Sequence, residues 1–204
     1  MSDHYYTRKP AADHDRKEHA ATIRNVTLKF VTDAGVFSKS GIDFGSRLLI
    51  ETLDLEGKTN LLDAGCGYGP IGLFAAKMYP QAQVTMIDIN ERAVQLAQEN
   101  AAMNRIDNVE VLQSDLLERL EGRVFDAIMT NPPIRAGKDV VYALFEQALE
   151  HLNENGELWV VIQKKQGAPS ALKKLESLFS EVQELNRKKG YRIYRAKRMA
   201  AGPF

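Results

Sequence analysis

The stretch Asn131-Pro132-Pro133-Ile134 is where the residue types most clearly suggest chemistry. It follows an apolar run over 125–130 that predicts a buried parallel strand. Each proline fixes its own φ and pushes the preceding residue out of the helical region, so the strand should end in a stiff turn. Because proline has no N–H, this turn offers mainly acceptors, which are the carbonyls and the Asn131 side-chain oxygen. We predict that Asn131, Pro132 and Pro133 meet a flat substrate that carries an –NH2 group.

A glycine-rich turn lies upstream, at Asp63-x-Gly65-x-Gly67-x-Gly69-Pro70. Glycine lets the backbone turn sharply and approach a ligand with no Cβ in the way. The spacing differs from the dinucleotide fingerprint Gly-x-Gly-x-x-Gly, because Pro70 stands where the third glycine would be. An acid before the glycines disfavours a pyrophosphate and favours a ligand that carries an ammonium group. We therefore predict that Asp63 and the three glycines bind an amino-acid-bearing nucleoside.

Two further acids follow successive predicted strands. Asp88 ends the strand over 83–88 and could accept hydrogen bonds from both ribose hydroxyls. Ser114-Asp115 follows the strand over 108–112 and could bind an adenine amino group. Each acid alone is more often a surface carboxylate or a helix cap. Together with Asp63 they would gather at one sheet edge, which favours a shared binding role.

The composition is typical of one globular domain. The chain has 204 residues, of which 44% are hydrophobic and 26% are charged, and no apolar run approaches the length of a membrane span. The single cysteine, Cys66, excludes an intramolecular disulfide and fits a reducing cytosol. The four histidines show no metal-ligand spacing, so no metal is expected. We expect a cytoplasmic protein that is a monomer or a weak homo-oligomer.

The net charge of zero conceals an uneven distribution of charge. Residues 60–159 carry 7 basic and 15 acidic side chains, whereas residues 160–204 carry 11 and 3. A basic end suggests contact with a polyanion, although charge alone fits a solvated surface equally well. The residues expected to contact phosphates are Lys164, Lys165, Arg187, Lys188, Lys189 and Arg192.

Strand and helix patterns alternate after residue 60. Strands are predicted over 60–64, 83–88, 108–112, 124–130, 156–163, 182–187 and 190–196, and helices over 70–79, 91–104, 139–152 and 169–180. The last two strands are joined through Lys188-Lys189-Gly190, which is too short for a crossover and requires a hairpin. We predict an α/β fold with a doubly wound, mostly parallel seven-stranded sheet that contains one antiparallel strand.

The region before residue 60 is predicted to hold a short β segment and one helix. Residues 22–30 read as a strand, 33–35 as a turn and Val36-Phe37 as the start of a return strand, and 43–53 has helical spacing. The expected organisation is an N-terminal extension with a β hairpin (1–40), the main domain (41–198) and a tail (199–204).

Over roughly residues 36–198 the sequence resembles the class I S-adenosylmethionine-dependent methyltransferases. The resemblance rests on the glycine turn with its acid, on Asp88, on Asp115 and on Asn131-Pro132-Pro133-Ile134. It implies a Rossmann-like fold and S-adenosyl-L-methionine as cofactor. The last motif is similar to that of the amino-methylating branch, which modifies exocyclic amines of bases or a glutamine amide. Most of that branch has Tyr, Phe or Trp where this chain has Ile134.

Segments 35–38, 43–49 and 131–138 together look like those of the RsmC-type ribosomal RNA guanine-N2 methyltransferases, most of all the short single-domain bacterial members. This resemblance implies the guanine 2-amino group in small-subunit ribosomal RNA as the target, with ribosomal RNA or the small ribosomal subunit as partner. We expect Phe37 at the cofactor, while lone aromatics are otherwise more often core. The residues expected at the substrate are Ile134, Arg135, Lys138, Phe44, Lys164 and Lys165.

Three alternatives remain open at this point. A glutamine-amide methyltransferase is the nearest, because that amide offers a similar –NH2 group. A methyltransferase-fold RNA-binding module without activity is the second, since a fold alone does not establish function. An NAD-dependent oxidoreductase is the third, and both the glycine spacing and Asn-Pro-Pro disfavour it. Cys66 is predicted to be a small packing residue rather than a nucleophile, because no histidine lies near it in the sequence.

Overall fold

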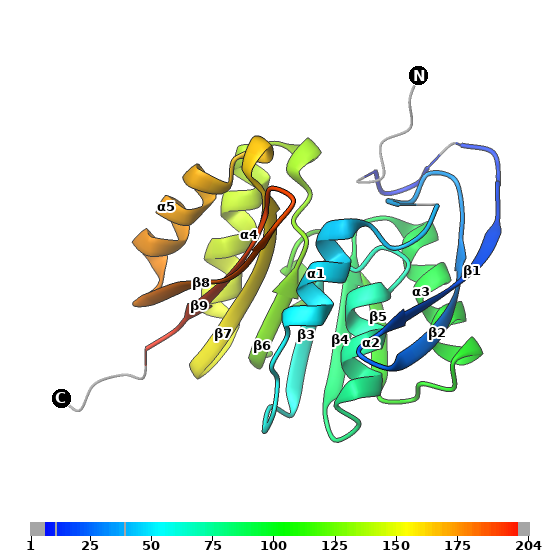
Figure 1. Ribbon diagram of the computed structural model, residues 1–204, viewed down its shortest axis with the longest axis horizontal. Helices are drawn as coiled ribbons and strands as arrows, with labels where there is room; N and C mark the ends of the chain where they lie inside the picture. Colours follow the sequence, from blue (N-terminus) through cyan, green and yellow to red (C-terminus); the bar gives the residue numbers. More distant parts are fainter. Residues whose placement is uncertain (1–6, 11, 39, 200–204) are drawn as a thin grey trace.

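Residues 7–10, 12–38 and 40–199, which this computed structural model describes, contain a sheet in the strand order β5-β4-β3-β6-β7-β9-β8 (Figure 1). The strands are β3 (Asn60–Ala64), β4 (Gln83–Asp88), β5 (Val109–Gln113), β6 (Phe125–Thr130), β7 (Leu152–Gln163), β8 (Glu181–Lys188) and β9 (Tyr191–Lys197). In the described residues β9 is antiparallel to β7 and β8, and the other neighbouring strands pair in parallel. The predicted doubly wound sheet with one antiparallel strand is confirmed. Residues 1–6 and all of the expected tail except Met199 lie outside the described residues.

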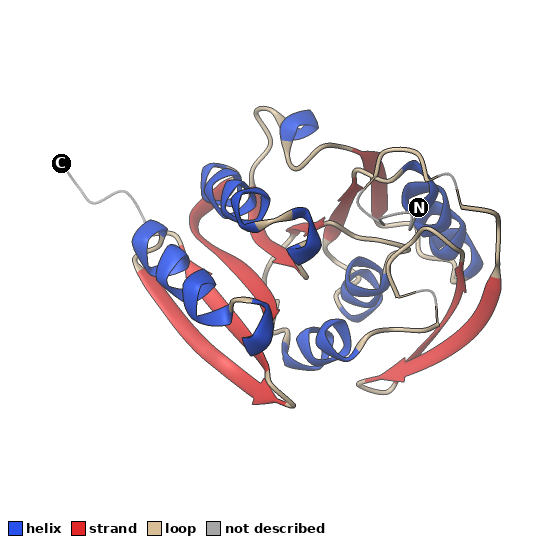
Figure 2. Ribbon diagram, turned by 90° about the horizontal axis from the view of Figure 1, so that it is seen from above, coloured by secondary structure: helices blue, strands red, loops and turns tan. Residues whose placement is uncertain are grey.

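Helices cover both faces of the sheet, as the view from above shows (Figure 2). One face carries α1 (Phe44–Thr52), α2 (Pro70–Met78) and α3 (Glu91–Met103), and the other carries α4 (Lys138–Glu150) and α5 (Ala168–Leu178). Short 3-10 segments are η1 (Glu118–Leu120), η2 (Ile134–Ala136) and η3 (Lys164–Gln166). Side chains alternate along each strand, so Leu61 of β3 packs under the first set of helices and Leu62 under the second. In the described residues no helix is long and apolar enough to cross a membrane.

A separate two-stranded hairpin precedes the sheet. β1 (Lys17–Ile23) and β2 (Val26–Thr32) pair antiparallel, and they turn at Arg24-Asn25, where φ is +51° and +64°. The single strand predicted over 22–30 is therefore wrong, because this two-residue turn divides it. The predicted return strand at Val36-Phe37 is also wrong, since those residues form turns.

The outer edge of β2 is held by side chains of α3. Asn100 accepts from the Val31 N–H at 2.7 Å and donates to the Val31 carbonyl at 3.0 Å. In the same way, Asn104 accepts from the backbone N–H of Lys29 at 2.9 Å and donates to the Lys29 carbonyl at 2.7 Å. Two amide side chains thus take the place of a neighbouring strand on this edge. Asn100 also donates to the Tyr68 carbonyl at 2.9 Å, which ties the hairpin to the glycine turn.

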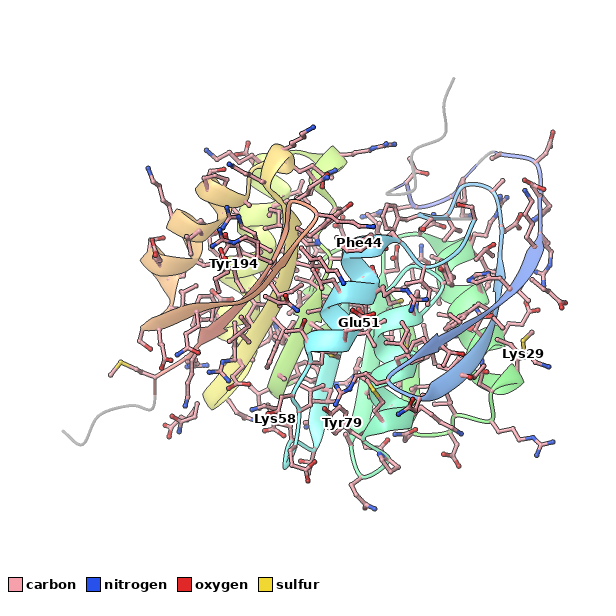
Figure 3. The ribbon with its side chains drawn as sticks, viewed as in Figure 1. Lys29, Phe44, Glu51, Lys58, Tyr79 and Tyr194 are labelled. Carbon is pink, nitrogen blue, oxygen red and sulfur yellow. The ribbon has the colours of Figure 1, made fainter. Side chains whose placement is uncertain are left out.

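Several elements begin or end at the same edge of the sheet. The register aligns Asp63 of β3 with Met86 of β4 and with Met129 of β6, so the glycine turn, Asp88 and Asn131 leave the sheet at one level. Helices α1, α2 and α3 all start there. Figure 3 shows Phe44 at this end of α1, whereas Lys58 and Tyr79 lie at the opposite end of the molecule. This edge is where parallel α/β sheets bind ligands.

Candidate active site

A cavity of about 380 Å³ opens at the carboxyl edge of β3, β4 and β6. Its volume lies within the range of small-molecule sites. Its walls are mainly apolar, with side chains from the glycine turn, α3, α4 and the segment before α1. The predicted site residues that line it are Phe37, Gly65, Gly67, Asp88, Asp115, Asn131, Pro132 and Pro133. The predicted site residues outside its lining are Asp63, Gly69, Ile134, Arg135, Lys138, Phe44, Lys164 and Lys165.

The first two glycines of the turn face the cavity. Gly65 and Gly67 have φ of +75° and +57°, and a Cβ added to either would meet no atom of the described residues within 4 Å. The turn is fixed from behind, because the N–H groups of Gly65 and Cys66 donate to the Ile87 carbonyl at 2.9 Å and 2.8 Å. A bound molecule can therefore approach this backbone closely, as the sequence predicts.

Gly69 does not line the cavity, and its lack of a side chain serves the packing of α2 against β4. Its φ is +110°, and a Cβ on it would lie 2.9 Å from Cδ1 of Leu73 and 3.1 Å from Cε of Met86. It directly precedes Pro70, the first residue of α2. Gly69 thus lets the chain enter α2 against β4.

Asp63 lies behind the turn rather than in the cavity. Its side chain is fully buried, and its Oδ2 accepts from the Gly72 N–H at 2.8 Å. No described residue donates to its Oδ1. Burial raises the pKa of Asp63 to about 7, because an ion is poorly solvated there. Asp63 therefore joins β3 to the first turn of α2, and this contact positions the glycine turn.

Asp88 links the turn to α3 and keeps one face toward the cavity. Its Oδ2 accepts from the Gly67 N–H at 2.8 Å and its Oδ1 from the Asn90 N–H at 2.9 Å. Burial raises its pKa to about 6, and the backbone N–H groups oppose that shift. Asp115 lies further along the same wall, where Nη2 of Arg8 is 3.2 Å from its Oδ2.

The orientation of Asn131 is set from α1. Its Nδ2 donates to Oγ of Ser46 at 3.0 Å and to Oδ2 of Asp43 at 3.3 Å. A carboxylate only accepts, so the amide nitrogen must face Asp43 and the Asn131 Oδ1 must point the other way. No described residue donates to that oxygen. The acceptor predicted for an incoming amine is therefore available in the structure.

The backbone beyond Asn131 forms a tight turn. The Pro132 carbonyl accepts from the Ile134 N–H at 2.8 Å, and Pro133 has φ −76° and ψ 75°, as in an inverse γ-turn. One lone pair of this carbonyl is thereby engaged, and the second can accept another donor. The Ile134 side chain packs against the core on the α4 face.

An aromatic and basic rim lies next to this end of the cavity. The rings of Phe44 and Tyr191 are 5.5 Å apart, and Nζ of Lys189 lies 4.9 Å from the centre of the Phe44 ring. The Lys164 N–H donates to the Gly190 carbonyl at 2.8 Å, which brings η3 to the β8–β9 turn (Figure 1). Exposed lysines of these two segments form what we call the lysine cluster, comprising Lys164, Lys165, Lys188 and Lys189.

The other predicted basic contacts differ in their surroundings. Arg187 and Arg192 both bind Glu184, at 2.8 Å and 2.6 Å, so their charge is partly neutralised. Arg135 and Lys138 are exposed just beyond the Asn-Pro-Pro turn, and Nζ of Lys138 lies 5.0 Å from the centre of the Tyr142 ring.

Asp43, Ser46 and Tyr68 are polar residues of the cavity that were not predicted as site residues. Asp43 caps α1, because its Oδ2 accepts from the Ser46 N–H at 3.1 Å. An acid before an amphipathic helix is a recognisable capping signal, so that role was accessible from sequence. Its contact with Asn131 joins residues 88 positions apart and has no local signal.

Several known proteins are similar to this chain over most of its length. The uncharacterised protein YbxB of Bacillus subtilis (strain 168) is 52% identical over 201 residues, which cover 98% of this chain and 100% of YbxB. Ribosomal RNA small subunit methyltransferase C of Haemophilus influenzae (strain PittGG) is 36% identical over 181 residues, which cover 87% of this chain and 53% of that protein.

A solved structure of the 16S rRNA N2 methyltransferase RsmC from T. thermophilus, in complex with AdoMet and guanosine, superposes with a TM-score of 0.80. The two are 28% identical, and the match covers 93% of this chain and 52% of that one. The chain therefore spans about half the length of both named methyltransferases. Residues 27–195 match the family described as methyltransferase small domain, and the chain belongs to that family.

Proposed function

We propose that this protein is an S-adenosylmethionine-dependent N-methyltransferase whose target is the guanine 2-amino group in small-subunit ribosomal RNA. The observation that carries the proposal is the fixed orientation of Asn131, whose Oδ1 is left as an acceptor in the cavity that the glycine turn also lines. The named relatives, which are small-subunit ribosomal RNA methyltransferases by name, support the choice of substrate.

The residues that line the cavity suit this cofactor. Gly65 and Gly67 offer bare backbone, and the apolar walls suit an adenosine. We assign the ribose hydroxyls to Asp88 and the adenine amino group to Asp115, with Phe37 at the cavity mouth. When bound, S-adenosylmethionine supplies an electrophilic methyl group on its sulfonium.

The protein's own contribution is to hold the acceptor nitrogen. An aromatic amine is a poor nucleophile, because its lone pair is delocalised into the ring. Hydrogen bonds from the –NH2 group to the Asn131 Oδ1 and to the second lone pair of the Pro132 carbonyl favour a more tetrahedral nitrogen. The same acceptors stabilise the positive charge that develops there. Ser46 and Asp43 fix the direction of the Asn131 amide, so little reorganisation is needed.

Cys66 takes no part in this chemistry. Burial raises the pKa of its thiol, and the carboxylates of Asp88 and Asp63 raise it further. The thiol therefore stays protonated and is a poor nucleophile. Its N–H donates to the Ile87 carbonyl, in keeping with the packing role that the sequence predicts.

The rim beside Asn131 suits RNA better than a protein substrate. The lysine cluster offers exposed positive charge for phosphates, and Phe44 and Tyr191 offer ring faces. Arg135 and Lys138 extend that charge past the Asn-Pro-Pro turn. A base must leave its helix to reach the Asn131 Oδ1, so we expect the target guanine in a loop or swung out of the stack.

The experiment that tests the activity offers the protein labelled cofactor with either deproteinised ribosomal RNA or ribosomal protein fractions. We expect label in the RNA, at a rate that Asn131→Ala lowers by about 100- to 1,000-fold. Label confined to the protein fraction would favour the glutamine-amide activity. Cofactor binding without methyl transfer to either fraction would favour an RNA-binding module that lacks activity.

A further inference from the structure

Acidic side chains line the cavity at both of its ends. Its lining within the described residues includes the carboxylates of Asp43, Asp88 and Asp115 but no lysine or arginine. Such a site attracts a ligand with a cationic group. Asp63, the acid expected from the sequence to meet an ammonium group, is buried behind the glycine turn and does not line the cavity. Another acceptor must therefore meet that charge.

Asp43 has the capacity to do so. Both hydrogen bonds that its side chain accepts, from the Ser46 N–H and from Asn131, end on Oδ2. No described residue donates to Oδ1, and this atom is not sealed from the cavity or the solvent. One carboxylate can therefore fix Asn131 through one oxygen and receive a ligand through the other.

Tyr68 adds an independent sign of a missing ligand at this end. The residue is 1% exposed, lines the cavity, and its hydroxyl has no hydrogen-bond partner among the described residues. A buried hydroxyl without a partner is costly in a folded protein. Burial and the nearby Asp43 charge both raise the pKa of Tyr68, so the hydroxyl stays neutral beside that carboxylate. An N–H donor placed here would satisfy both groups.

We propose that Asp43 Oδ1 and the Tyr68 hydroxyl bind the α-ammonium group of the amino-acid portion of the cofactor. The inference rests on the proposed function, and it assigns the ammonium to the residue that also orients Asn131. The methionine end of the cofactor and the acceptor for the substrate amine would then share one carboxylate. Asp43 is thus a cofactor-binding residue and a positioning residue for Asn131.

The test compares ligands that do and do not carry the ammonium group. Calorimetry would measure the affinities of three ligands. S-adenosylhomocysteine carries both the amine and the carboxylate, and decarboxylated S-adenosylmethionine keeps the amine but lacks the carboxylate. The third ligand, 5′-methylthioadenosine, lacks both groups. In Asp43→Asn the helix cap is preserved, because asparagine caps as well as aspartate. We expect this variant to lose roughly 10- to 100-fold affinity for the first two ligands and less than about twofold for the third.

Matched variants separate this inference from a general defect. Asp115→Asn, at the adenine end, should weaken all three ligands by a similar factor. Tyr68→Phe should weaken the two amine ligands by a few-fold while leaving 5′-methylthioadenosine unchanged. Unaltered melting temperatures would show that each variant is folded.

Two results would overturn the assignment while leaving the proposed function in place. One is equal loss of all three ligands in Asp43→Asn. The other is that Asp63→Asn loses the preference for the two amine ligands over 5′-methylthioadenosine, while Asp43→Asn keeps the whole of that preference. Failure of the wild-type protein to bind any of the three ligands would instead remove the proposed function, and this inference with it.

Discussion

The orientation of the Asn131 side chain is set by contacts that the sequence does not reveal. The Asn-Pro-Pro motif predicts the acceptor, but the hydrogen bonds from Asn131 to Ser46 and Asp43 decide which atom of the amide faces the cavity. These contacts depend on the docking of α1 against the sheet, so they follow from the tertiary fold and not from local spacing. The places of Gly65, Gly67 and Asp88 at the cavity, in contrast, were predictable, because their positions at strand ends follow from chain order alone.

Removal of the Asn131 side chain should affect turnover far more than cofactor affinity. We expect Asn131→Ala to lower kcat by about 100- to 1,000-fold, as removal of a group that stabilises the developing charge does in other enzymes. Ser46→Ala should lower kcat by several-fold only, because Asp43 still holds the amide nitrogen. Single-turnover methylation and calorimetry with S-adenosylhomocysteine measure the two quantities. Wild-type turnover in Asn131→Ala would show that the turn is only structural.

Asp88 should give cofactor binding a pH dependence. Its pKa in the ligand-free protein is about 6, and hydrogen bonds from ribose hydroxyls need the ionised form. The affinity for S-adenosylhomocysteine should therefore fall below pH 6, by up to about tenfold per pH unit. At neutral pH, Asp88→Ala should weaken binding by roughly 1–3 kcal/mol, since two hydrogen bonds to a charged group are removed.

Calorimetry between pH 5 and pH 8 measures this dependence. Asp88→Asn should bind with an affinity that no longer changes through pH 6. An unchanged affinity in Asp88→Ala would remove the ribose assignment.

At the scale of elements, the contact between β3 and α2 has a measurable effect on the free energy of unfolding, because it buries the carboxyl group of Asp63. Asp63 joins β3 to α2 inside the core, and its folded-state pKa of about 7 lies above its ordinary value of 3.8. The folded state therefore binds this proton more tightly than the unfolded state. The resulting stabilisation is complete below about pH 4 and is lost as the pH rises through 7.

We expect the free energy of unfolding of the ligand-free protein to fall by roughly 2–3 kcal/mol between pH 5 and pH 8 through Asp63. Asp63→Asn should remove most of this fall, because the amide does not ionise. Urea unfolding at the two pH values measures the difference. The raised pKa of Asp88 acts in the same direction over pH 5–6, so Asp88→Asn serves as the comparison. Identical pH dependence in wild type and Asp63→Asn would contradict the buried-carboxyl account.

The central elements were predictable because helical and strand periods alternate strongly from residue 60 onward. An N-terminal hairpin was expected, but its strands were misplaced, since Arg24-Asn25 lacks the glycine that usually marks a two-residue turn. Its β-branched neighbours instead read as one continuous strand over 22–30. The contacts that hold the hairpin, from Asn100 and Asn104, come from a helix distant in sequence.

At the scale of the whole molecule, four exposed lysines from two segments gather beside the start of α1. The lysine cluster gathers beside Phe44, whereas Lys29 and Lys58 lie far from it (Figure 3). In the described residues no member of the cluster forms an ion pair, so its charge is available to phosphates. The sequence predicted a basic end, but only the fold shows which of its residues adjoin the cavity.

Reversal of charge in this cluster should weaken RNA binding. We expect the triple variant Lys164→Glu, Lys165→Glu, Lys189→Glu to bind a ribosomal RNA fragment at least about tenfold more weakly at low salt. The slope of log affinity against log salt should fall by about 0.7–0.9 for each phosphate that the variant no longer neutralises. Filter binding across a salt series measures both, with Lys29→Glu as the control. Equal binding by the triple variant and the control would identify the cluster as an ordinary solvated surface.

The most direct measurement of the proposed function is mass spectrometry of small-subunit ribosomal RNA from a strain that lacks this protein. We predict that one N2-methylguanosine disappears, that the wild-type gene restores it, and that the Asn131→Ala gene does not. If every N2-methylguanosine of the small subunit remains in the deletion strain, the assignment to guanine is wrong.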